Sequence, residues 1–240
     1  MRRSAFLARF ASVACLGGLA ALEGCARRPA PAPRAQATPG RPVRIVALGD
    51  SLAFGTGASA PRNGFIFRAY LRVLERHPGS RIDDYAIPGS VAADVLRVQV
   101  PRLAQARADA VVVCVGGNDV VHRNGPAAFA ATYARLVERV RALQPHAAIV
   151  LCGIPDVGLS PLFTGADHDE VAGLSRKDDA TVRAIARRYG AAFVDLYAVT
   201  THAHGSVNRF LSDDRFHPSD AGYAAFADAL APALLRAVEH

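Results

Sequence analysis

A serine, an aspartate and a histidine lie in two short polar segments near opposite ends of the sequence. Ser51 follows the apolar run 43–49, and His217 comes three residues after Asp214 in the segment DRFHP. A serine hydroxyl can attack a carbonyl carbon when an imidazole takes its proton and a carboxylate holds that imidazole in place. These residue types therefore indicate acyl transfer, with Ser51 as nucleophile, His217 as base and Asp214 as the group that fixes the histidine tautomer.

Each of these residues also has a purely structural interpretation. Serine is a preferred helix N-cap, so Ser51 could simply begin the helical turn after the strand. Asp214 and His217 could cap the final helix, with Pro218 at its first position. Asp213 is a rival to Asp214 as the partner of His217, although the three-residue spacing favours Asp214.

A glycine and an asparagine could donate hydrogen bonds to the oxyanion of such a reaction. Gly89 follows the second apolar run and would let a backbone N–H approach the substrate with no Cβ in the way. Asn118 follows the third run and offers a neutral amide. Donors of this kind are worth roughly 10²–10³ in rate each. Taken singly, both are more often turn residues, and we expect Asp50 and Asp119 to bond backbone in their own loops.

Alternating strand and helix patterns must position these residues. Apolar runs predict five strands, at 43–49, 81–86, 110–116, 148–153 and 192–196. The third run, AVVVCVGG, is apolar on both faces, which is typical of a parallel strand covered on both sides. Helical periodicity predicts helices over 65–76, 129–143, 171–189 and 221–238. Another helix begins at Ser90, with Val91, Val95 and Val98 on one face and Pro101 at its end or bend.

This alternation predicts an α/β fold, a three-layer α/β/α sandwich with right-handed crossovers. In such sheets ligands bind beyond the carboxyl ends of the strands. The first three predicted strands end in GDS, IPGS and GGND, and DDRFHPSD precedes the last helix. The candidate residues are therefore expected at one edge of the sheet.

Four sequence blocks resemble those of the SGNH hydrolases, also called GDSL lipases or esterases. The blocks are GDSL at 49–52, YAIPGS at 85–90, GGND at 116–119 and DRFHP at 214–218. They come in order and span nearly all of 43–240. One departure is Asp84, where many members carry asparagine, and it bears on the geometry of the second loop.

The resemblance implies specific residues and a specific fold. The namesake residues would be Ser51, Gly89, Asn118 and His217, with Asp214 as the acid of the triad. The sheet would be flavodoxin-like, with five parallel strands in the order 2-1-3-4-5. No metal or cofactor is expected.

The first 24 residues predict a signal peptide of the lipoprotein type. Arg2 and Arg3 give a basic start, and the apolar run 10–21 is short for a membrane span. ALEGC at 21–25 resembles a bacterial lipobox, which implies cleavage before Cys25 and a diacylglycerol on its sulfur. Ordinary secretion, with Cys25 an incidental thiol, is the alternative. Either way, we expect export to the bacterial periplasm or cell envelope.

Residues 25–42 are rich in Pro, Ala and Arg and predict an extended tether. Of the formal net charge of +7, the tether carries +4 and the leader +2, which leaves +1 for the predicted hydrolase domain at 43–240. The basicity therefore gives no reason to expect nucleic acid. The positive charge fits attraction to an anionic envelope surface. The expected partner is therefore a membrane, to which a lipid on Cys25 would anchor the chain.

Three further features have mostly structural interpretations. Cys114 and Cys152 lie in predicted strands and are expected to be buried as small hydrophobic residues. HAH at 202–204 is expected in a surface loop rather than at a metal. GIPDVGLSPLF at 153–163 predicts an irregular loop that helps to wall the acyl or alcohol pocket.

Together these features predict a serine esterase that hydrolyses carboxylic (acyl) esters. A thioesterase, a lysophospholipase or a carbohydrate O-acetylesterase would use the same site and differ only in pocket shape. The alternative from another class is a catalytically silent, envelope-binding lipoprotein, which would not need the full set of candidate residues. Acyl chain length and oligomeric state have no signature in the sequence.

Overall fold

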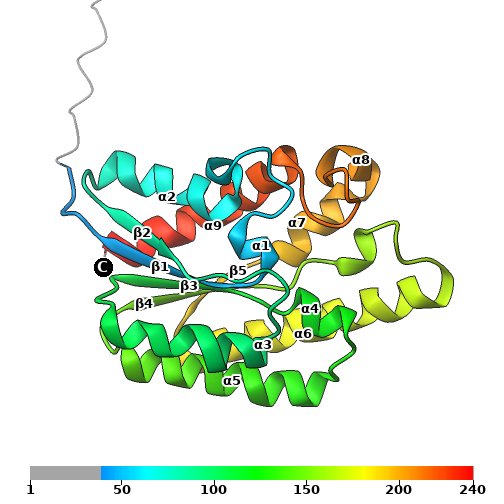
Figure 1. The fold of residues 1–240 in the computed structure, drawn as a ribbon, viewed down its shortest axis with the longest axis horizontal. Coiled ribbons are helices and arrows are strands. Elements are labelled where there is room, and N and C mark those ends of the chain that lie inside the picture. The colour runs from blue at the N-terminus through cyan, green and yellow to red at the C-terminus, as the bar shows by residue number, and fades with distance from the viewer. Residues whose placement is uncertain (1–38, 240) are drawn as a thin grey trace, which may run out of the picture. The chain divides into compact units, whose positions relative to one another are not determined.

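Five parallel strands form a sheet of order β2-β1-β3-β4-β5 in the computed structural model, which describes residues 39–239 (Figure 1). The strands are β1 (Arg44–Gly49), β2 (Arg81–Asp84), β3 (Ala110–Cys114), β4 (Ala148–Cys152) and β5 (Ala192–Val194). The predicted α/β fold and strand order are confirmed. Four strands end one or two residues earlier than predicted, because the chain leaves the sheet to form the loops of the candidate site.

The predicted signal peptide and Cys25 lie outside the described residues, as does the predicted tether up to residue 38. These predictions are therefore not addressed by the structure. Within residues 39–239, none of the helices combines the length and the apolar character that crossing a membrane requires.

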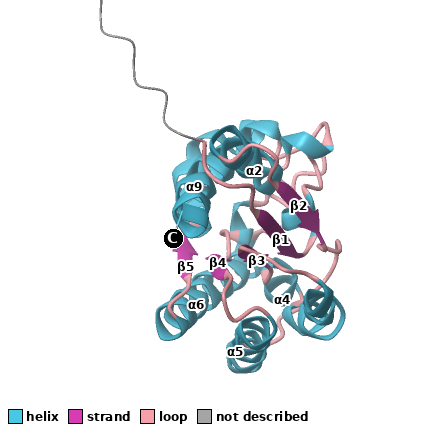
Figure 2. Ribbon diagram, turned by 90° about the vertical axis from the view of Figure 1, so that its left-hand side faces the viewer, coloured by secondary structure: helices cyan, strands magenta, loops and turns pink. Residues whose placement is uncertain are grey.

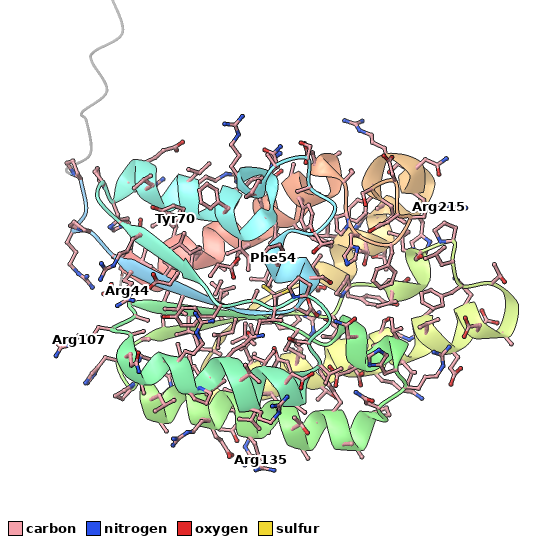
Figure 3. All side chains as sticks on the ribbon, in the orientation of Figure 1. Arg44, Phe54, Tyr70, Arg107, Arg135 and Arg215 are labelled. Carbon is pink, nitrogen blue, oxygen red and sulfur yellow. The ribbon has the colours of Figure 1, made fainter. Side chains whose placement is uncertain are left out.

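Helices cover both faces of the sheet (Figures 1 and 2). One layer contains α2 (Phe65–Arg76) and α9 (Asp220–Glu239), and the other contains α5 (Pro126–Leu143) and α6 (Gly165–Tyr189). The shorter helices are α1 (Ser51–Phe54), α3 (Ala92–Asp94), α4 (Gly117–Val121), α7 (Leu196–Ala203) and α8 (Val207–Phe210). Because α1, α4 and α7 directly follow β1, β3 and β5, they lie at the carboxyl ends of the strands. Figure 3 shows Phe54 of α1 near this edge and Arg44 and Arg107 at the opposite edge.

The core is divided by the sheet into two apolar clusters. In β1, Ile45 and Ala47 pack into the cluster that contains α2 and α9, whereas Val46 and Leu48 pack into the cluster that contains α5 and α6. The same alternation runs through β3 and β4. It follows from the two-residue period of a strand that is covered on both faces.

An aromatic cluster joins α2 to α9. The ring of Phe65 stacks on Tyr223 with centroids 6.2 Å apart and meets Phe226 edge-on at 5.7 Å. The hydroxyl of Tyr223 donates to the carbonyl of Thr56 at 2.6 Å. This contact ties α9, the last helix, to the segment after α1, the first helix. The two parts of the sequence that contain Ser51 and His217 are thereby held close together.

The segment after Ser90 differs from the helix that was predicted there. After α3 the chain forms a π-turn at Val95–Gln99 and a 3₁₀ helix at Val100–Gln105, so Pro101 does not end the helical segment. Val98 is 38% exposed, whereas the side chain of Gln99 is fully buried. The wider π-turn shifts the helical register, and this turns Gln99 toward the sheet in place of Val98.

Candidate active site

Strand β1 ends where only a glycine fits. A Cβ on Gly49 would lie 2.0 Å from the carbonyl oxygen of Cys114 in the neighbouring strand. The buried side chain of Gln99 accepts a hydrogen bond from Gly49 N and donates one to Gly49 O, both at 2.8 Å. The strand end is therefore fixed on both sides, and the chain leaves the sheet at the next residue.

Asp50, not Ser51, caps the short helix α1. Its carboxylate accepts from Leu52 N at 2.9 Å, and Ser51 is the first helical residue. The interpretation of Ser51 as the N-cap is therefore wrong. Burial raises the pKa of Asp50 to about 7, although backbone N–H groups that include Gly116 N–H act in the opposite direction. Asp50 thus links the turn that carries Ser51 to the loop at the end of β3, as predicted for a structural residue.

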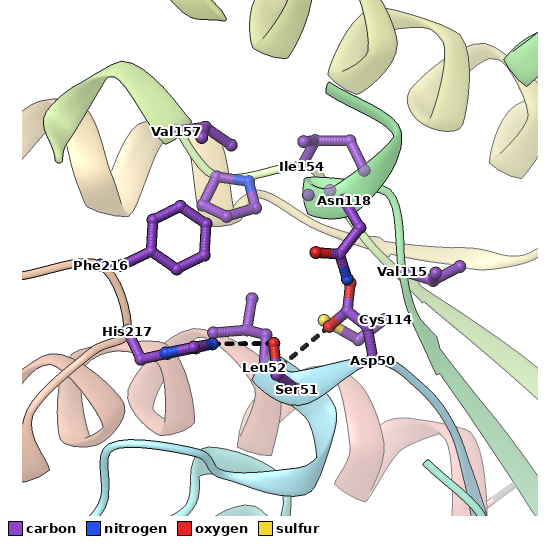
Figure 4. A pocket seen from close by; sticks show the side chains of 13 residues that line it. Asp50, Ser51, Leu52, Cys114, Val115, Asn118, Ile154, Val157, Phe216 and His217 are labelled. Atoms are coloured by element: carbon purple, nitrogen blue, oxygen red, sulfur yellow. Dashed lines mark hydrogen bonds between the residues drawn. The ribbon is translucent and has the colours of Figure 1, made fainter. Parts of the chain in front are cut away.

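A chain of hydrogen bonds joins Ser51, His217 and Asp214. His217 Nε2 lies 2.9 Å from Ser51 Oγ, and His217 Nδ1 lies 2.6 Å from Asp214 Oδ2 (Figure 4). Ser51 and His217 are 166 residues apart in the sequence. The structure therefore brings together the three residues that their types and spacing singled out, and it selects Asp214 over Asp213 as the partner of the histidine.

The loop that carries His217 is closed on itself. Ser212 N donates to His217 O at 2.8 Å, and Leu211 and Pro218 form an antiparallel bridge. Helix α9 begins only at Asp220, with the Ser219 carbonyl accepting from Tyr223 N at 2.8 Å. His217 and Pro218 consequently do not begin or cap that helix, and the structural interpretation of this loop is wrong.

Asp214 is held as a carboxylate by several donors. Its Oδ1 accepts from Phe216 N, His217 N and Ser212 Oγ at 2.8–2.9 Å. Burial acts to raise the pKa of Asp214, but the hydrogen bonds, led by the one from His217, outweigh it and hold the pKa below its usual value. Asp214 is therefore ionised at neutral pH and can only accept from the imidazole.

A glycine lets this loop approach α1 closely. Gly57 has φ of +90°, and a Cβ there would lie 2.8–2.9 Å from Ser212 Oγ, His217 Cβ and Pro218 O. Any larger residue would push the histidine loop away from Ser51. The residues that follow the GDSL block therefore also help to position His217 next to Ser51.

Asn118 lies in α4 with its amide fixed by backbone. Its Nδ2 donates to the carbonyl of Ser90 at 3.0 Å, and its side chain lines the pocket beside Ser51 (Figure 4). An amide nitrogen carries two hydrogens, so one remains for a ligand. The neighbouring Asp119 accepts from Ala92 N at 2.9 Å and from Asn124 Nδ2 at 3.1 Å. Asp119 therefore braces these loops, as predicted.

Gly89 is not among the residues that line this pocket. It lies exposed in the turn between Ile87 and Ser90, with φ of +83°. Ile87 N donates to Gly49 O at 3.1 Å, and Ser90 O accepts from Asn118. The turn is thus held between β1 and Asn118, but a contribution of the Gly89 N–H to the oxyanion stays a prediction.

The pocket beside Ser51 is mostly apolar. The loop after β4 contributes Gly153, Ile154, Pro155 and Val157, so this segment lines the site as predicted. The full lining is Asp50, Ser51, Leu52, Cys114, Val115, Gly117, Asn118, Gly153, Ile154, Pro155, Val157, Phe216 and His217. Phe216 and the bracing residue Gln99 were not predicted from the sequence. The signal for Gln99 was an uncharged polar residue in the largely apolar stretch VLRVQV.

The two histidines of HAH are exposed at the surface, as predicted, but they lie in helical segments and not in a loop. His202 lies in α7, and His204 Nε2 lies 3.2 Å from the buried Asp156. No group of three or more His, Cys, Asp and Glu side chains within residues 39–239 is placed to hold a metal ion. Cys114 and Cys152 are buried, as predicted, and are free thiols.

Comparison with known families decides the classification of the chain. Residues 47–225 match the GDSL-like Lipase/Acylhydrolase family. The chain belongs to the GDSL-like lipase/acylhydrolase family. This confirms the resemblance to the SGNH hydrolases that the four sequence blocks indicated.

Individual relatives agree with this family. The GDSL-like esterase Rv1075c of Mycobacterium tuberculosis (strain ATCC 25618 / H37Rv) is 32% identical over 203 residues, which are 80% of this chain and 62% of that protein. The chain thus spans about three fifths of the length of this curated relative. The acetylxylan esterase Axe2 from Geobacillus stearothermophilus superposes with a TM-score of 0.65 at 22% identity, over 84% of this chain and 96% of Axe2. The psychrotrophic esterase EstA from Pseudoalteromonas sp. gives 0.64 at 16%, over 82% and 100%. The last two similarities show the fold.

Two buried carboxyl groups lie behind the loop that follows β4 in this GDSL-family domain. Asp178 and Asp179 of α6 are 3% and 5% exposed, and no donor within residues 39–239 reaches Oδ1 of either. Burial, and next the charge of Asp119, raise the pKa of Asp178 to about 6. Burial, and next the charge of Asp195, raise the pKa of Asp179 to about 6, against the opposing effect of Arg183.

These raised pKa values predict that the domain is more stable in mild acid. The folded state favours the protonated form of Asp178, so folding takes up a proton between the unfolded pKa near 4 and the folded pKa of about 6. This contribution to stability is present below about pH 4 and is lost as the pH rises through about 6. We expect the Tm to fall from pH 5 to pH 8, and to fall less in Asp178→Asn. Asp169→Asn, on an exposed part of the same helix, is the control and should keep the wild-type difference. Equal pH dependence in all three proteins would contradict the assignment.

Proposed function

We propose that the protein is a serine esterase that hydrolyses carboxylic (acyl) esters. Ser51 is the nucleophile, His217 is the general base, and Asp214 orients the imidazole and stabilises its protonated form. The observation that carries this proposal is the continuous hydrogen-bond chain from Ser51 Oγ through His217 to Asp214, with distances of 2.9 and 2.6 Å. Membership of the lipase/acylhydrolase family supports the same reaction class.

The charge state of Asp214 selects the histidine tautomer. Because an ionised carboxylate only accepts hydrogen bonds, the proton of the neutral imidazole lies on Nδ1. Nε2 then carries a lone pair that faces Ser51 Oγ. As Oγ bonds to the carbonyl carbon, its proton passes to Nε2. The same proton is then given to the leaving oxygen when the ester bond breaks.

The carbonyl oxygen becomes negatively charged in this step and needs donors. The candidates among the residues that line the pocket are the free amide hydrogen of Asn118 and the backbone N–H of Ser51, at the start of α1. The Gly89 N–H, from the turn after β2, is the third candidate. Each such donor contributes roughly 10²–10³ in rate. A water molecule, deprotonated by His217, then attacks the acyl-enzyme and releases the acid with Ser51 restored.

Thioesters, lysophospholipids and O-acetylated carbohydrates would react by the same steps. A catalytically silent binding protein is disfavoured, because such a protein has no need for a serine, an imidazole and a carboxylate aligned in hydrogen-bond contact.

Kinetics on p-nitrophenyl acetate test the proposal. We expect Ser51→Ala to lose at least about 10³ of kcat, because the attacking oxygen is absent. Asn118→Ala should lower kcat by roughly 10²–10³ with a smaller change in KM, because its amide bonds the developing charge more strongly than the ground-state carbonyl. Thermal melts show whether both variants stay folded. A folded Ser51→Ala protein that kept more than a few percent of wild-type kcat would refute the assignment.

We also propose that the protein is exported and anchored through a lipid on Cys25. The support is the sequence alone, namely the apolar run 10–21, the lipobox-like ALEGC and the tether-like segment at 25–42. A soluble domain at the end of such a tether would act on substrates within reach of the membrane surface.

Mass spectrometry of membrane-extracted protein tests this anchor. We expect a mature chain that begins at Cys25 with a diacylglycerol on its sulfur. Cys25→Ser should leave the protein unlipidated, since serine offers no thiol. An unmodified wild-type chain that begins at another residue would exclude the anchor without bearing on the esterase proposal.

A further inference from the structure

We propose that the apolar pocket beside Ser51 binds the acyl part of the ester and limits it to short chains, from acetyl to about hexanoyl. Val157 is the residue that sets this limit. The inference deepens the proposed esterase function and rests on it.

The arrangement of the site leaves one direction for the acyl chain. In the tetrahedral intermediate, the carbonyl carbon carries Ser51 Oγ, the oxyanion, the leaving oxygen and the acyl chain. The leaving oxygen must face His217 Nε2, which protonates it, and the oxyanion must face the amide of Asn118. Figure 4 shows His217 and Asn118 on opposite sides of Ser51, with Val157, Ile154 and Phe216 across the pocket between them. The acyl chain therefore points toward these apolar side chains.

The lining of the pocket fits an unsubstituted alkyl group. Its apolar side chains are Leu52, Cys114, Val115, Ile154, Pro155, Val157 and Phe216. None of the polar side chains in the lining is left for the acyl chain, since Ser51 and His217 bond each other, Asp50 caps α1, and Asn118 bonds Ser90 O with one amide hydrogen and faces the oxyanion with the other. A hydroxyl or charged group on the acyl chain would lose its hydration here without a new partner.

The size of the pocket limits the length of the chain. Its volume is about 60 Å³. A single water molecule occupies roughly 10–15 Å³, so a pocket of this size has room for a short alkyl chain and not for a long one. An acyl chain of about six carbons, with its carbonyl at Ser51, fills this space. A longer chain meets the fixed wall at Val157, so it must bend back toward solvent or draw its carbonyl away from Ser51, and both lower the rate.

The wall at Val157 is fixed by buried hydrogen bonds. Val157 N donates to Ser175 Oγ of α6 at 3.1 Å, and Asp156 N donates to Thr200 Oγ1 of α7 at 2.8 Å. The carboxylate of Asp156 also accepts from Gly158 N at 3.0 Å. These contacts tie the short 3₁₀ turn Val157–Leu159 to two helices, so a longer chain cannot easily displace it.

Leu159 provides a matched control for Val157. The two residues lie in the same turn and are 6% and 7% exposed. Only Val157 lines the pocket, whereas Leu159 packs into the cluster on the other face of the sheet. Shortening Leu159 therefore removes a similar buried contact without changing the pocket.

The test is kcat/KM of the full chain on two ester series, each kept below its micelle concentration. One series lengthens the acyl chain of p-nitrophenyl esters from acetyl to dodecanoyl, and the other lengthens the alcohol of acetate esters. For wild type we expect roughly a fourfold gain per methylene up to butyryl or hexanoyl, and at least a tenfold loss by decanoyl. Val157→Ala should move the acyl optimum one or two carbons longer. Leu159→Ala should keep the wild-type optimum even if its Tm falls.

Three results would overturn the inference. One is a rate that stays level or rises up to dodecanoyl, and another is an equal shift of the optimum in Val157→Ala and Leu159→Ala. A shift caused by Val157→Ala in the alcohol series alone would assign the pocket to the alcohol. In each case Ser51→Ala would still be inactive, so the esterase proposal would stand. Activity retained by folded Ser51→Ala would instead refute the esterase proposal and the inference with it.

Discussion

The hydrogen bond between His217 and Ser51 is the contact on which the arrangement of the site depends. It joins two loops that are 166 residues apart in the sequence, across a distance of 2.9 Å. The strand order places β1 inside the sheet, between β2 and β3, so Ser51 emerges at the carboxyl edge with a strand on either side. The packing of α9 on α2 then returns the His217 loop to this edge. Sheet order and helix packing are therefore both needed to form a single interatomic contact.

Buried polar side chains convert the surrounding loops into a fixed frame. Gln99 binds both backbone groups of Gly49, Asp50 caps α1, Asp119 binds Ala92 N, and Asp156 caps the turn at Val157. A buried polar group is costly unless it is hydrogen-bonded, so each of these contacts strongly favours one loop geometry. His217 and Asp214 can then remain partly open to solvent, while the residues that fix the loops around Ser51 are buried.

The sequence predicted the fold and the main site residues because both have local signals. Strand–helix alternation indicated the class. The polar segments after two strands marked Ser51 and Asn118, and the polar segment before the last helix marked His217. Gln99 was missed because a regular helical period assigns Val98 to the buried face, and only the π-turn reverses this. Phe216 has no local signal, since a pocket wall arises from loops that meet only in the folded chain. The segment 153–163 was predicted to line the pocket, but for the same reason Val157 could not be singled out within it. The direction of the Gly89 N–H could not be predicted, because a glycine has no side chain whose pattern of burial would indicate how the backbone is turned.

The central claim is that His217 activates Ser51 for attack, and covalent labelling measures this most directly. A fluorophosphonate reacts with an activated serine and leaves a phosphonyl group on its oxygen. We expect one label per chain on the peptide that contains Ser51, and labelling at least about 10³-fold slower in His217→Ala. Labelling at a different serine, or equal rates in the two proteins, would contradict this account.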